Sequence, residues 1–340
     1  MAELPALVQA LLTPEAYPHR PGEIELAQTQ MSFIFLTGDY VYKVKKPVDL
    51  GYLDYTTLER RKHFCHQEVI LNRRLCPETY LDVVTISQEN GKFFIEGRGE
   101  AIEYAVKMRQ LPQQRMMDNL LRDNQVTEEM IARVARRVAE FHQKAETNAE
   151  ISGFGDLSMV VTNTEENFTQ SEKYIGVSIP RERYDAIKSY TENFLKENTR
   201  LFRRRVEQGR IKDCHGDLHA GHVCFSNGLC IFDCIEFNDR FRYCDVTSEI
   251  AFLAMDLDYH GRSDLSQHFV LTYEKISGDQ EMNQLIDFYK CYRAYVRGKV
   301  ESFKLDDPHF SEEEKRRGLA IASRYFELAE SYIMILYTEH

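Results

Sequence analysis

The stretch CHGDLHAGHV, residues 214–223, concentrates the chemistry of this sequence. It places one cysteine, three histidines and one aspartate within ten positions, with two glycines between them. A second stretch, IFDCIEF at 231–237, is an apolar run interrupted by Asp233. These residue types suit two kinds of site, a metal centre or a phosphate-transfer site, and the positions of the carboxylates help to choose between them.

Asp217 lies in a glycine-flanked loop, and Asp233 lies at the end of an apolar strand. A carboxylate in such a place is suited to hold a cation in a cleft. A hairpin that joins the two loops brings both carboxylates to one cleft. Phosphoryl transfer needs one group to orient the attacking hydroxyl and another to hold the metal on the nucleotide phosphates. The pattern therefore favours phosphate transfer.

Short β-rich runs dominate the first part of the chain. The segment MSFIFLTGDYVYKVKK, residues 31–46, has two such runs around a turn at Gly38 and predicts a hairpin. Because side chains alternate along a strand, Lys43 and Lys45 are expected on one face, together with Val41. Further strands are predicted at 81–86, at 92–96 and in EYAVKM, residues 103–108.

A helix is predicted over about 54–75, with Asp54 as its N-cap. Glu68 lies in the middle of its apolar stripe, where an unpaired carboxylate is costly, so a lysine on a neighbouring strand is its expected partner. Pro112 marks the expected boundary between a small β-rich lobe, 1–110, and a helical lobe, 111–340.

Helices are expected to dominate the second lobe. Residues 145–165, which contain Gly, Asn and Thr, are expected to form a loop, and 211–237 short strands and loops. Ser311 and Glu314 form a capping box at the start of the last helix. The predicted helices are 127–145, 180–208, 246–258, 264–276, 280–304 and 311–336.

The bulk composition limits the classes of function. The chain has 340 residues with a formal net charge of -11, which argues against nucleic acid as a partner. Short basic runs at 60–62 and 203–205 are expected to be solvated helix faces. No apolar run has the length of a membrane span, and the start lacks the features of a signal peptide. Eight scattered cysteines without a CxxC pair predict reduced thiols and a cytoplasmic protein.

HGDLHAGH resembles the catalytic loop H-G-D-x-x-x-x-N of the aminoglycoside phosphotransferase family, a branch of the protein-kinase-like fold. FDCIEF resembles its metal-binding segment, and CDVTSEIA resembles its G-D-P-x-x-D-L-A segment, with Asp245 matching and Glu249 in place of Asp. The resemblance covers most of the chain. It implies a bilobal α/β (α+β) fold, with ATP between a small β-rich N-lobe and a larger helical C-lobe.

The resemblance also implies roles for individual residues. Asp217 orients the acceptor hydroxyl, and His215 braces the same loop. Asp233 binds Mg²⁺, and His222, where the family has Asn, is a candidate second ligand that favours Mn²⁺ more than Asn does, or else a brace for Asp217. The residues assigned to the nucleotide are Lys43, with Lys45 as its competitor, Glu68 as its partner, Ser32 in place of a Gly-rich loop, and Met108 at the hinge.

The expected reaction is transfer of the ATP γ-phosphate to a hydroxyl of a small molecule. Acidic residues around the loop, among them Glu236 and Asp239, favour a neutral or cationic acceptor. Three alternatives remain. They are a zinc protein that uses Cys214, His215, His219, His222 and Cys224, a kinase-like binding module that has lost turnover, and a nucleotidyl transferase on the same fold.

Overall fold

The computed structural model describes residues 4–226, 228–307 and 310–338. The chain divides into two compact units. One comprises Met1–Asn119 with Gly221–Asp239, and the other comprises Leu120–Ala220 with Arg240–His340. We call them the sheet unit and the helical unit. The lobe boundary near residue 110 remains a prediction, and segment 221–239 packs with the sheet unit.

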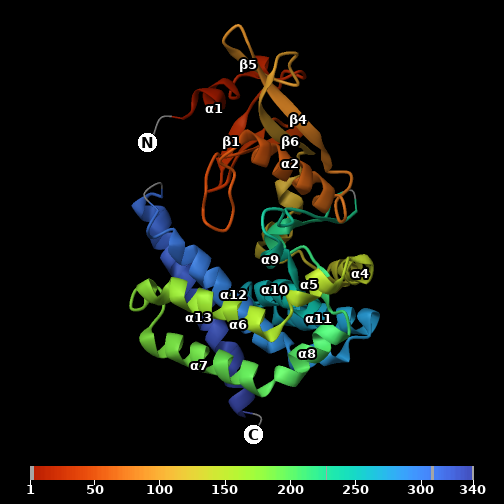
Figure 1. The fold of residues 1–340 in the computed structure, drawn as a ribbon, viewed down its shortest axis with the longest axis vertical. Coiled ribbons are helices and arrows are strands. Elements are labelled where there is room, and N and C mark those ends of the chain that lie inside the picture. The colour runs from red at the N-terminus through yellow and green to blue at the C-terminus, as the bar shows by residue number, and fades with distance from the viewer. Residues whose placement is uncertain (1–3, 227, 308–309, 339–340) are drawn as a thin grey trace. The chain divides into compact units, whose positions relative to one another are not determined.

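The sheet unit is built on a curled antiparallel sheet of six strands in the order β1-β2-β3-β6-β4-β5 (Figure 1). Every strand predicted from the sequence is present. The strands are β1 Glu25–Gln28, β2 Ser32–Leu36, β3 Tyr40–Lys45, β4 Tyr80–Glu89, β5 Lys92–Ile95 and β6 Ala101–Arg109. Gly38, with a φ of 89°, turns the chain between β2 and β3, as the sequence predicts.

Each face of the sheet carries its own apolar core. Alternation along β3 sends Val41 toward helix α2, Leu58–Asn72, and sends Tyr42 and Val44 to the opposite face. The short helix α1, Ala6–Ala10, and the 3-10 turn Pro14–Ala16 contribute to that opposite core. Lys43 and Lys45 therefore share the α2 face, as predicted.

Helix α2 starts later than the sequence predicts. Its N-cap is Thr57, whose side chain accepts a hydrogen bond from the amide of Arg60. Asp54 instead accepts from the amide and hydroxyl of Thr56, and it pairs with Arg60. The prediction of Asp54 as the cap is wrong because a second oxygen side chain stands three positions closer to the first helical turn.

The prediction that all cysteines are reduced is also wrong. Cys76, just after α2, forms a disulfide with Cys230, although 154 positions separate them in the sequence. Cys230 begins strand β9, Cys230–Ile231, which pairs with β8, Val223–Cys224. Tertiary packing brought the two thiols together, and cysteine spacing contains no information about such a pair.

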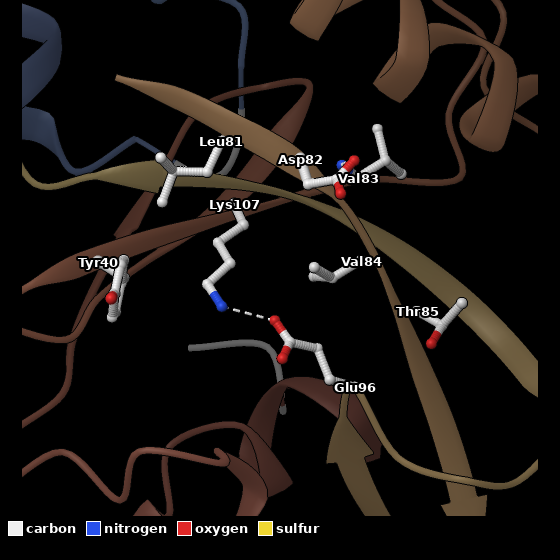
Figure 2. Close-up of a pocket in the computed structure, with 8 residues that line it drawn as sticks. All are labelled: Tyr40, Leu81, Asp82, Val83, Val84, Thr85, Glu96 and Lys107. Atoms are coloured by element: carbon white, nitrogen blue, oxygen red, sulfur yellow. Dashed lines mark hydrogen bonds and ion pairs between the residues drawn. The ribbon is translucent and has the colours of Figure 1, made fainter. Parts of the chain in front are cut away.

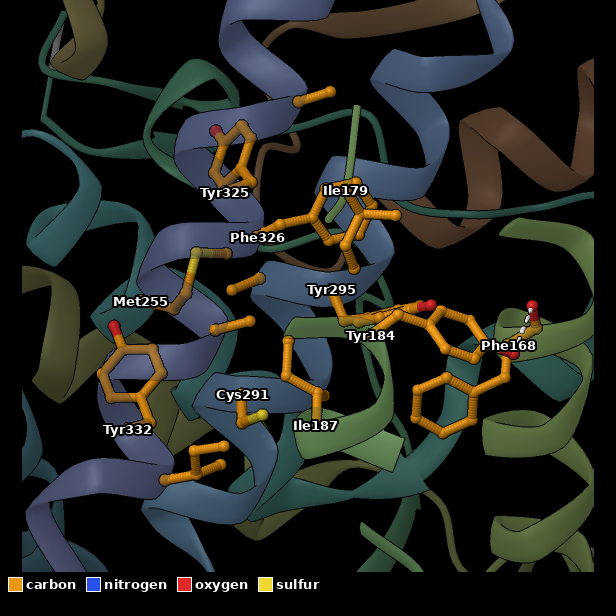
Figure 3. Packing of buried hydrophobic residues seen from close by; sticks show 14 of the residues in the cluster. Phe168, Ile179, Tyr184, Ile187, Met255, Cys291, Tyr295, Tyr325, Phe326 and Tyr332 are labelled. Carbon is orange, nitrogen blue, oxygen red and sulfur yellow. Dashed lines mark hydrogen bonds between the residues drawn. The ribbon is translucent and has the colours of Figure 1, made fainter. Parts of the chain in front are cut away.

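The helical unit is a bundle with two short strands. Helix α12 packs against α13 and α10, and α11 packs against α4. One apolar core of this unit is made of aromatic and aliphatic side chains from α6, α7, α10, α12 and α13, including Phe168, Tyr295 and Phe326 (Figure 3). The main helices are α4 Glu128–Lys144, α6 Leu157–Ser171, α7 Arg181–Glu197, α8 Thr199–Glu207, α10 Val246–Tyr259, α11 Ser263–Ser277, α12 Ile286–Phe303 and α13 Glu312–Thr338. The shorter elements are α3 Met117–Arg122, α5 Ala149–Gly153, α9 Asp239–Arg242, β7 Ile211–Asp213 and β10 Tyr243–Asp245.

Most of these helices match their predicted ranges, and Ser311 and Glu314 form the expected capping box. The loop predicted over 145–165 is wrong, because α5 and most of α6 occupy it. Helix α6 is rich in Asn and Thr, which have modest helix propensity. Burial of residues such as Phe168 stabilises it instead.

Arginines in both basic runs are buried rather than solvated. Arg61 pairs with Glu103 through two short contacts, and Arg205 pairs with Asp245 and Asp279. The prediction of solvated helix faces is wrong at these positions. Ion pairing compensates the cost of burying both guanidinium groups.

Among the described residues, no helix combines the length and the apolar character that crossing a membrane requires.

Candidate active site

Lys43 occupies the centre of a charged cluster on the α2 face of the sheet unit. Its Nζ lies 2.9 Å from a carboxylate oxygen of Glu68 and 2.6 Å from Oδ1 of Asp233. Glu68, on α2, is fully buried, whereas the Lys43 side chain is 15 % exposed and that of Asp233 is 39 % exposed. The partner that the sequence predicts for Glu68 is thus in place, and the cluster opens to solvent at Asp233.

Lys45 lies deeper in the same cluster. Its Nζ contacts the second oxygen of Glu68 at 2.7 Å and a carboxylate oxygen of Glu236 at 2.5 Å. The Tyr55 hydroxyl also donates to Glu236, at 2.7 Å. Because Lys45 is 1 % exposed and held by two buried carboxylates, it cannot reach a ligand in this arrangement. Lys43 is the lysine placed to do so.

The electrostatics of the cluster keep Lys43 and Glu68 charged. Burial alone would lower the pKa of Lys43, but Asp233 and Glu68 outweigh burial and raise this pKa well above its usual value. Burial would raise the pKa of Glu68, yet the two lysines outweigh it and lower this pKa. With two lysines and three carboxylates, the cluster carries a formal charge of about -1 at neutral pH.

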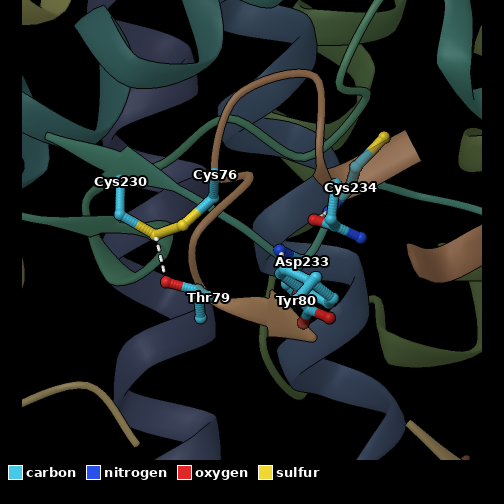
Figure 4. Close-up of a disulfide and its surroundings, with 7 residues drawn as sticks. Cys76, Thr79, Tyr80, Cys230, Asp233 and Cys234 are labelled. Carbon is cyan, nitrogen blue, oxygen red and sulfur yellow. Dashed lines mark hydrogen bonds between the residues drawn. A yellow bond between two sulfur atoms is a disulfide. The ribbon is translucent and has the colours of Figure 1, made fainter. Parts of the chain in front are cut away.

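Asp233 is held in an unusual backbone conformation. Its φ is 62°, in the left-handed region where a residue other than glycine is uncommon. Its amide donates to the Tyr80 hydroxyl, and the next amide, of Cys234, donates to the Asn72 side chain. Figure 4 shows Asp233, Cys234 and Tyr80. Strained backbone that is fixed by its neighbours is a feature of ligand-binding positions.

His222 lies beside Asp233. Its Nε2 is 3.5 Å from Oδ2 of Asp233, and its ring packs against Phe232. Its backbone carbonyl accepts from the amide of Phe232, which ties together the two segments that carry the site. This is where the sequence predicts a second metal ligand, although the ligand role itself stays a prediction.

The donors at Asp233 fit Mg²⁺. A partly exposed carboxylate is the hard oxygen ligand that this ion prefers, and Mg²⁺ commonly takes only one or two carboxylates beside phosphate oxygens. The imidazole nitrogen of His222 suits Mn²⁺ better than Mg²⁺.

Two further residues assigned to the nucleotide occupy different environments. Ser32 is 1 % exposed, and its amide donates to Oγ1 of Thr29 at 3.0 Å. In this arrangement that amide already has a partner. Met108, 8 % exposed, is packed in the apolar core under β3. Nucleotide contact by either residue remains a prediction.

The sheet unit also has an open hollow, whose lining residues are not those of this cluster. It has a volume of ≈ 660 Å³ and is lined by residues that include Tyr40, Val84 and Thr85 (Figure 2). Lys107 and Glu96 form an ion pair within it, at 2.6 Å. Tyr40 is two residues from Tyr42 on β3, so this hollow lies on the sheet face opposite Lys43.

In the helical unit, Asp217 lies on a firmly held loop after β7. The side chain of Glu249, at the start of α10, accepts the amides of His215 and Gly216 at 2.7 and 2.6 Å. The amide of Asp217 donates to the His215 ring at 3.3 Å. His215 is 1 % exposed, whereas the Asp217 side chain is 33 % exposed. The loop is rigid while its carboxylate faces solvent.

Glu249 is ionised in spite of its burial. Burial would raise its pKa, but His142 at 2.7 Å, His215 and the loop amide outweigh burial and lower the pKa to about 2. Asp245, which caps α10, is buried and accepts two hydrogen bonds from Arg205. Glu249 therefore holds the loop directly, whereas the contacts of Asp245 are with Arg205, on α8, and with the amide of Thr247 at the start of α10.

The cysteines of the zinc alternative are poorly suited as ligands. Cys214 and Cys224 are fully buried, and burial raises the pKa of both thiols, whereas zinc binds the thiolate. Cys224 belongs to the apolar core of the sheet unit, and Cys214 to the helical unit.

Sequence reasoning missed three side chains that surround the Asp217 loop. Arg293, on α12, donates to the carbonyl of Gly216 at 3.4 Å, and Asp256, on α10, accepts the amide of Ala220 at 2.8 Å. Arg297 follows Arg293 by one helical turn. The i, i+4 arginine pair in a predicted helix was the available signal, because such residues share one face.

No protein-family model matches the sequence. Proteins of Mycobacterium tuberculosis and Mycobacterium bovis that carry the name uncharacterized protein are 33 % identical over 279 residues. The match covers 82 % of this chain and 54 % of each relative, so the chain spans about half the length of these relatives.

A choline/ethanolamine kinase family protein from Mesorhizobium loti has a similar structure. The TM-score is 0.51 at 12 % identity, over 95 % of this chain and 98 % of that one. The chain therefore has a kinase-like fold, and the predicted fold class, a mixed α/β protein with a β-rich N-terminal part and a helical C-terminal part, is confirmed.

Aminoglycoside phosphotransferases are also among the solved structures that resemble this chain. One from Alicyclobacillus acidocaldarius has a TM-score of 0.49 at 11 % identity, over 99 % of this chain and 97 % of that one. One from Streptomyces rimosus, solved with ADP and streptomycin, has a TM-score of 0.40 at 12 % identity, over 90 % and 92 % of the chains.

Proposed function

We propose that this protein is an ATP-dependent phosphotransferase that moves the γ-phosphate to a hydroxyl of a small molecule. The observation that carries the proposal is the Lys43–Glu68–Asp233 cluster, in which a strand lysine, a helix glutamate and a left-handed aspartate meet in one unit. Phosphoryl transfer needs such a set to position the nucleotide phosphates and a metal.

In the structure, Lys43 and Asp233 neutralise one another at 2.6 Å. In the proposed complex they exchange partners, with Lys43 donating to phosphate oxygens and Asp233, with His222 beside it, holding Mg²⁺. When bound, the ion neutralises phosphate charge. Glu68 retains Lys45 and keeps Lys43 aligned, because it contacts each lysine through a different oxygen.

Asp217 is the group proposed to act on the acceptor. Its carboxylate accepts the hydroxyl proton as the acceptor oxygen bonds to the γ-phosphorus, while the bond from that phosphorus to the ADP oxygen breaks. The amide contacts of His215 and Gly216 with Glu249 fix the loop, so the carboxylate is oriented in advance. His215 contributes by accepting the Asp217 amide.

An ATP-consumption screen over hydroxyl-bearing metabolites tests the proposal, with Asp217→Asn as the blank. We expect turnover that falls at least about 100-fold in this variant. Asp233→Asn, whose amide tolerates the left-handed backbone, should lose Mg²⁺-dependent nucleotide binding without unfolding. Equal turnover in wild type and both variants would exclude the assignment.

A kinase-like binding module is the second candidate, and the observation that favours it is His222 in the place of Asn, 3.5 Å from Asp233. A module would bind MgATP and consume none in the presence of any acceptor. Mass spectrometry of the products separates phosphoryl from nucleotidyl transfer, because the acceptor gains either one phosphate or a nucleoside monophosphate.

A further inference from the structure

Arg297 is a partly buried cation that belongs to no ion pair within the described residues. Its guanidinium lies over the Tyr325 ring, 5.5 Å from the ring centroid, and its Nε has no hydrogen-bond partner. A buried donor without a partner is rare, because it forfeits its hydrogen bonds to water. Among the described residues, no carboxylate lies within ion-pair distance of this guanidinium.

The position of Arg297 relates it to Asp217. Arg293 ties α12 to the Asp217 loop through the Gly216 carbonyl, and Arg297 lies one turn further along the same helix face. Burial would lower the pKa of Arg297, but Tyr325, Asp217 and Asp256, in that order, outweigh burial and raise this pKa. The guanidinium therefore lies within electrostatic range of the proposed catalytic carboxylate, yet the two form no ion pair.

The neighbours of Arg297 are fixed by other contacts. Tyr325, from α13, stacks on Tyr259 with centroids 3.9 Å apart and donates to Asp256 at 3.4 Å. Asp256 also accepts the amide of Ala220, in the Asp217 loop. Asp256 is thus already engaged, and the aromatic pair holds the guanidinium in place.

The acidic residues that suggested a neutral or cationic acceptor do not form one acidic surface. Glu236 pairs with Lys45 and Asp245 with Arg205, so both are neutralised and buried. Asp239 is exposed. Two described arginines near the Asp217 loop, Arg293 and Arg297, have no carboxylate partner. Arg293 donates to the carbonyls of Ser248 and Gly216, so Arg297 is the candidate for an anionic group, and this reverses the expected charge of the acceptor.

We propose that Arg297 is a specificity-determining residue that binds an oxyanion of the acceptor, so that the substrate is a hydroxylated acid rather than an amine. This inference rests on the proposed phosphotransferase function. The planar guanidinium suits bidentate contact with a carboxylate or a phosphate. The same acceptor then presents its hydroxyl to Asp217.

The test uses two carbon skeletons, each in four charge forms. The hexose set is gluconate, glucose 6-phosphate, glucose and glucosamine, and the small set is glycerate, glycerol 3-phosphate, glycerol and 3-amino-1,2-propanediol. Two readouts are taken on the full chain, namely ATP turnover, and calorimetric binding of each compound without nucleotide. The variants are Arg297→Gln and Arg297→Lys. The control is Arg324→Gln, which removes an exposed arginine lying over Tyr259 at 4.4 Å.

We expect an acid form to be preferred over the neutral and amine forms of its own skeleton. Arg297→Gln should raise the KM for that acid about tenfold or more, with the KM for ATP unchanged, because a charge-assisted contact is lost. Arg297→Lys should lose less, and Arg324→Gln should behave as wild type. If Arg297→Gln impairs only gluconate or glycerate, the recognised group is a carboxylate. If it impairs only glucose 6-phosphate or glycerol 3-phosphate, the group is a phosphate.

Two results overturn the inference while leaving phosphotransfer intact. One is turnover that favours glucosamine, 3-amino-1,2-propanediol or a neutral form, and the other is acid turnover that Arg297→Gln does not change. Binding of an acid that depends on Arg297, with no ATP consumed, would instead support the inference and refute the proposed function. Failure of every acid in both readouts overturns the inference.

Discussion

Two lysines two positions apart on β3 have different surroundings, and these predict different effects of mutation. Removing Lys43 leaves Glu68 paired with Lys45 and leaves Asp233 partly solvated. Lys43→Ala should therefore weaken MgATP binding with little loss of stability. Removing Lys45 leaves Glu236 and Glu68 buried without their shared cation, which costs about 3 kcal/mol or more. Chemical denaturation and nucleotide titration of both variants measure these effects.

Lys46→Ala serves as the control for this pair, because Lys46 has solvent-exposed hydrogen bonds beyond the cluster. If Lys43→Ala binds nucleotide as wild type does while Lys45→Ala folds normally and does not bind, the roles of the two lysines are reversed.

Glu249 makes the stability of the helical unit depend on pH, and the direction of this dependence follows from its pKa. Its pKa of about 2 in the folded protein is below the ordinary carboxyl value, so its stabilising effect is present above that ordinary value. The effect is lost as pH falls through the range from 4.5 to 2, and it amounts to about 3 kcal/mol. Glu249→Gln should therefore be less stable than wild type at pH 7, with a smaller difference at pH 3.

Urea denaturation at the two pH values measures this difference. Glu313→Gln, at a largely exposed side chain, is the matched control and should follow wild type throughout. A difference between Glu249→Gln and wild type that is the same at pH 7 and pH 3 would contradict the assignment of the charge to Glu249.

If His222 binds the metal, the protein should be less selective for Mg²⁺ over Mn²⁺ than a variant with Asn at this position. The His222 nitrogen faces the Asp233 carboxylate at 3.5 Å, and a nitrogen donor suits Mn²⁺ better than Mg²⁺. His222→Asn should therefore raise the ratio of Mg²⁺-supported to Mn²⁺-supported turnover. Steady-state assays with each metal give the ratio, and His219→Asn is the comparison within the same sequence stretch. An unchanged ratio shows that His222 does not act as a ligand.

At the scale of elements, the Cys76–Cys230 disulfide fixes the segment that presents Asp233. It joins the chain just after α2 to β9, and Thr79 contacts Sγ of Cys230 at 3.6 Å (Figure 4). Cys76→Ser or Cys230→Ser should lower the free energy of unfolding by about 2–5 kcal/mol, because the unfolded chain gains freedom. Nucleotide binding should weaken as well, because Asp233 follows β9 directly.

Thiol titration of the denatured protein checks the disulfide itself. Six of the eight cysteines are free, so six thiols should react before reduction and eight after it. Cys244→Ser, at a partly exposed free cysteine, controls for loss of a thiol. Eight reactive thiols without reductant would refute the disulfide.

Most elements could be predicted from local pattern, and the failures have physical causes. β3 and the capping box at Ser311 depend on alternation and on a short motif, so both were found. Helix α6 depends on burial of Phe168 in a core assembled from distant helices, so its own composition was misleading. The disulfide depends on a contact across 154 positions.

At the scale of the whole molecule, binding of MgATP should stabilise the folded chain. A ligand at 100 times its Kd contributes about 2.7 kcal/mol, so thermal unfolding should shift upward in wild type. The shift should require Mg²⁺, vanish with excess chelator and be lost in Asp233→Asn. Differential scanning calorimetry measures it. A shift of the same size in Asp233→Asn would place the nucleotide elsewhere.

The sequence by itself determined the fold class and the identity of the charged residues. Alternation put Lys43 and Lys45 on one face, and the position of Glu68 on an apolar stripe required a cationic partner. These are local properties, because periodicity and the cost of burying charge act within a single element.

Tertiary structure alone decided which of the charged residues can contact a ligand and which are buried in ion pairs. It buried Lys45 between Glu68 and Glu236 and left Lys43 next to the more exposed Asp233. It also bonded Cys76 to Cys230 and set Arg297 near Asp217 without an ion pair. Burial and partner choice depend on packing between segments far apart in the chain, and no local pattern encodes that packing.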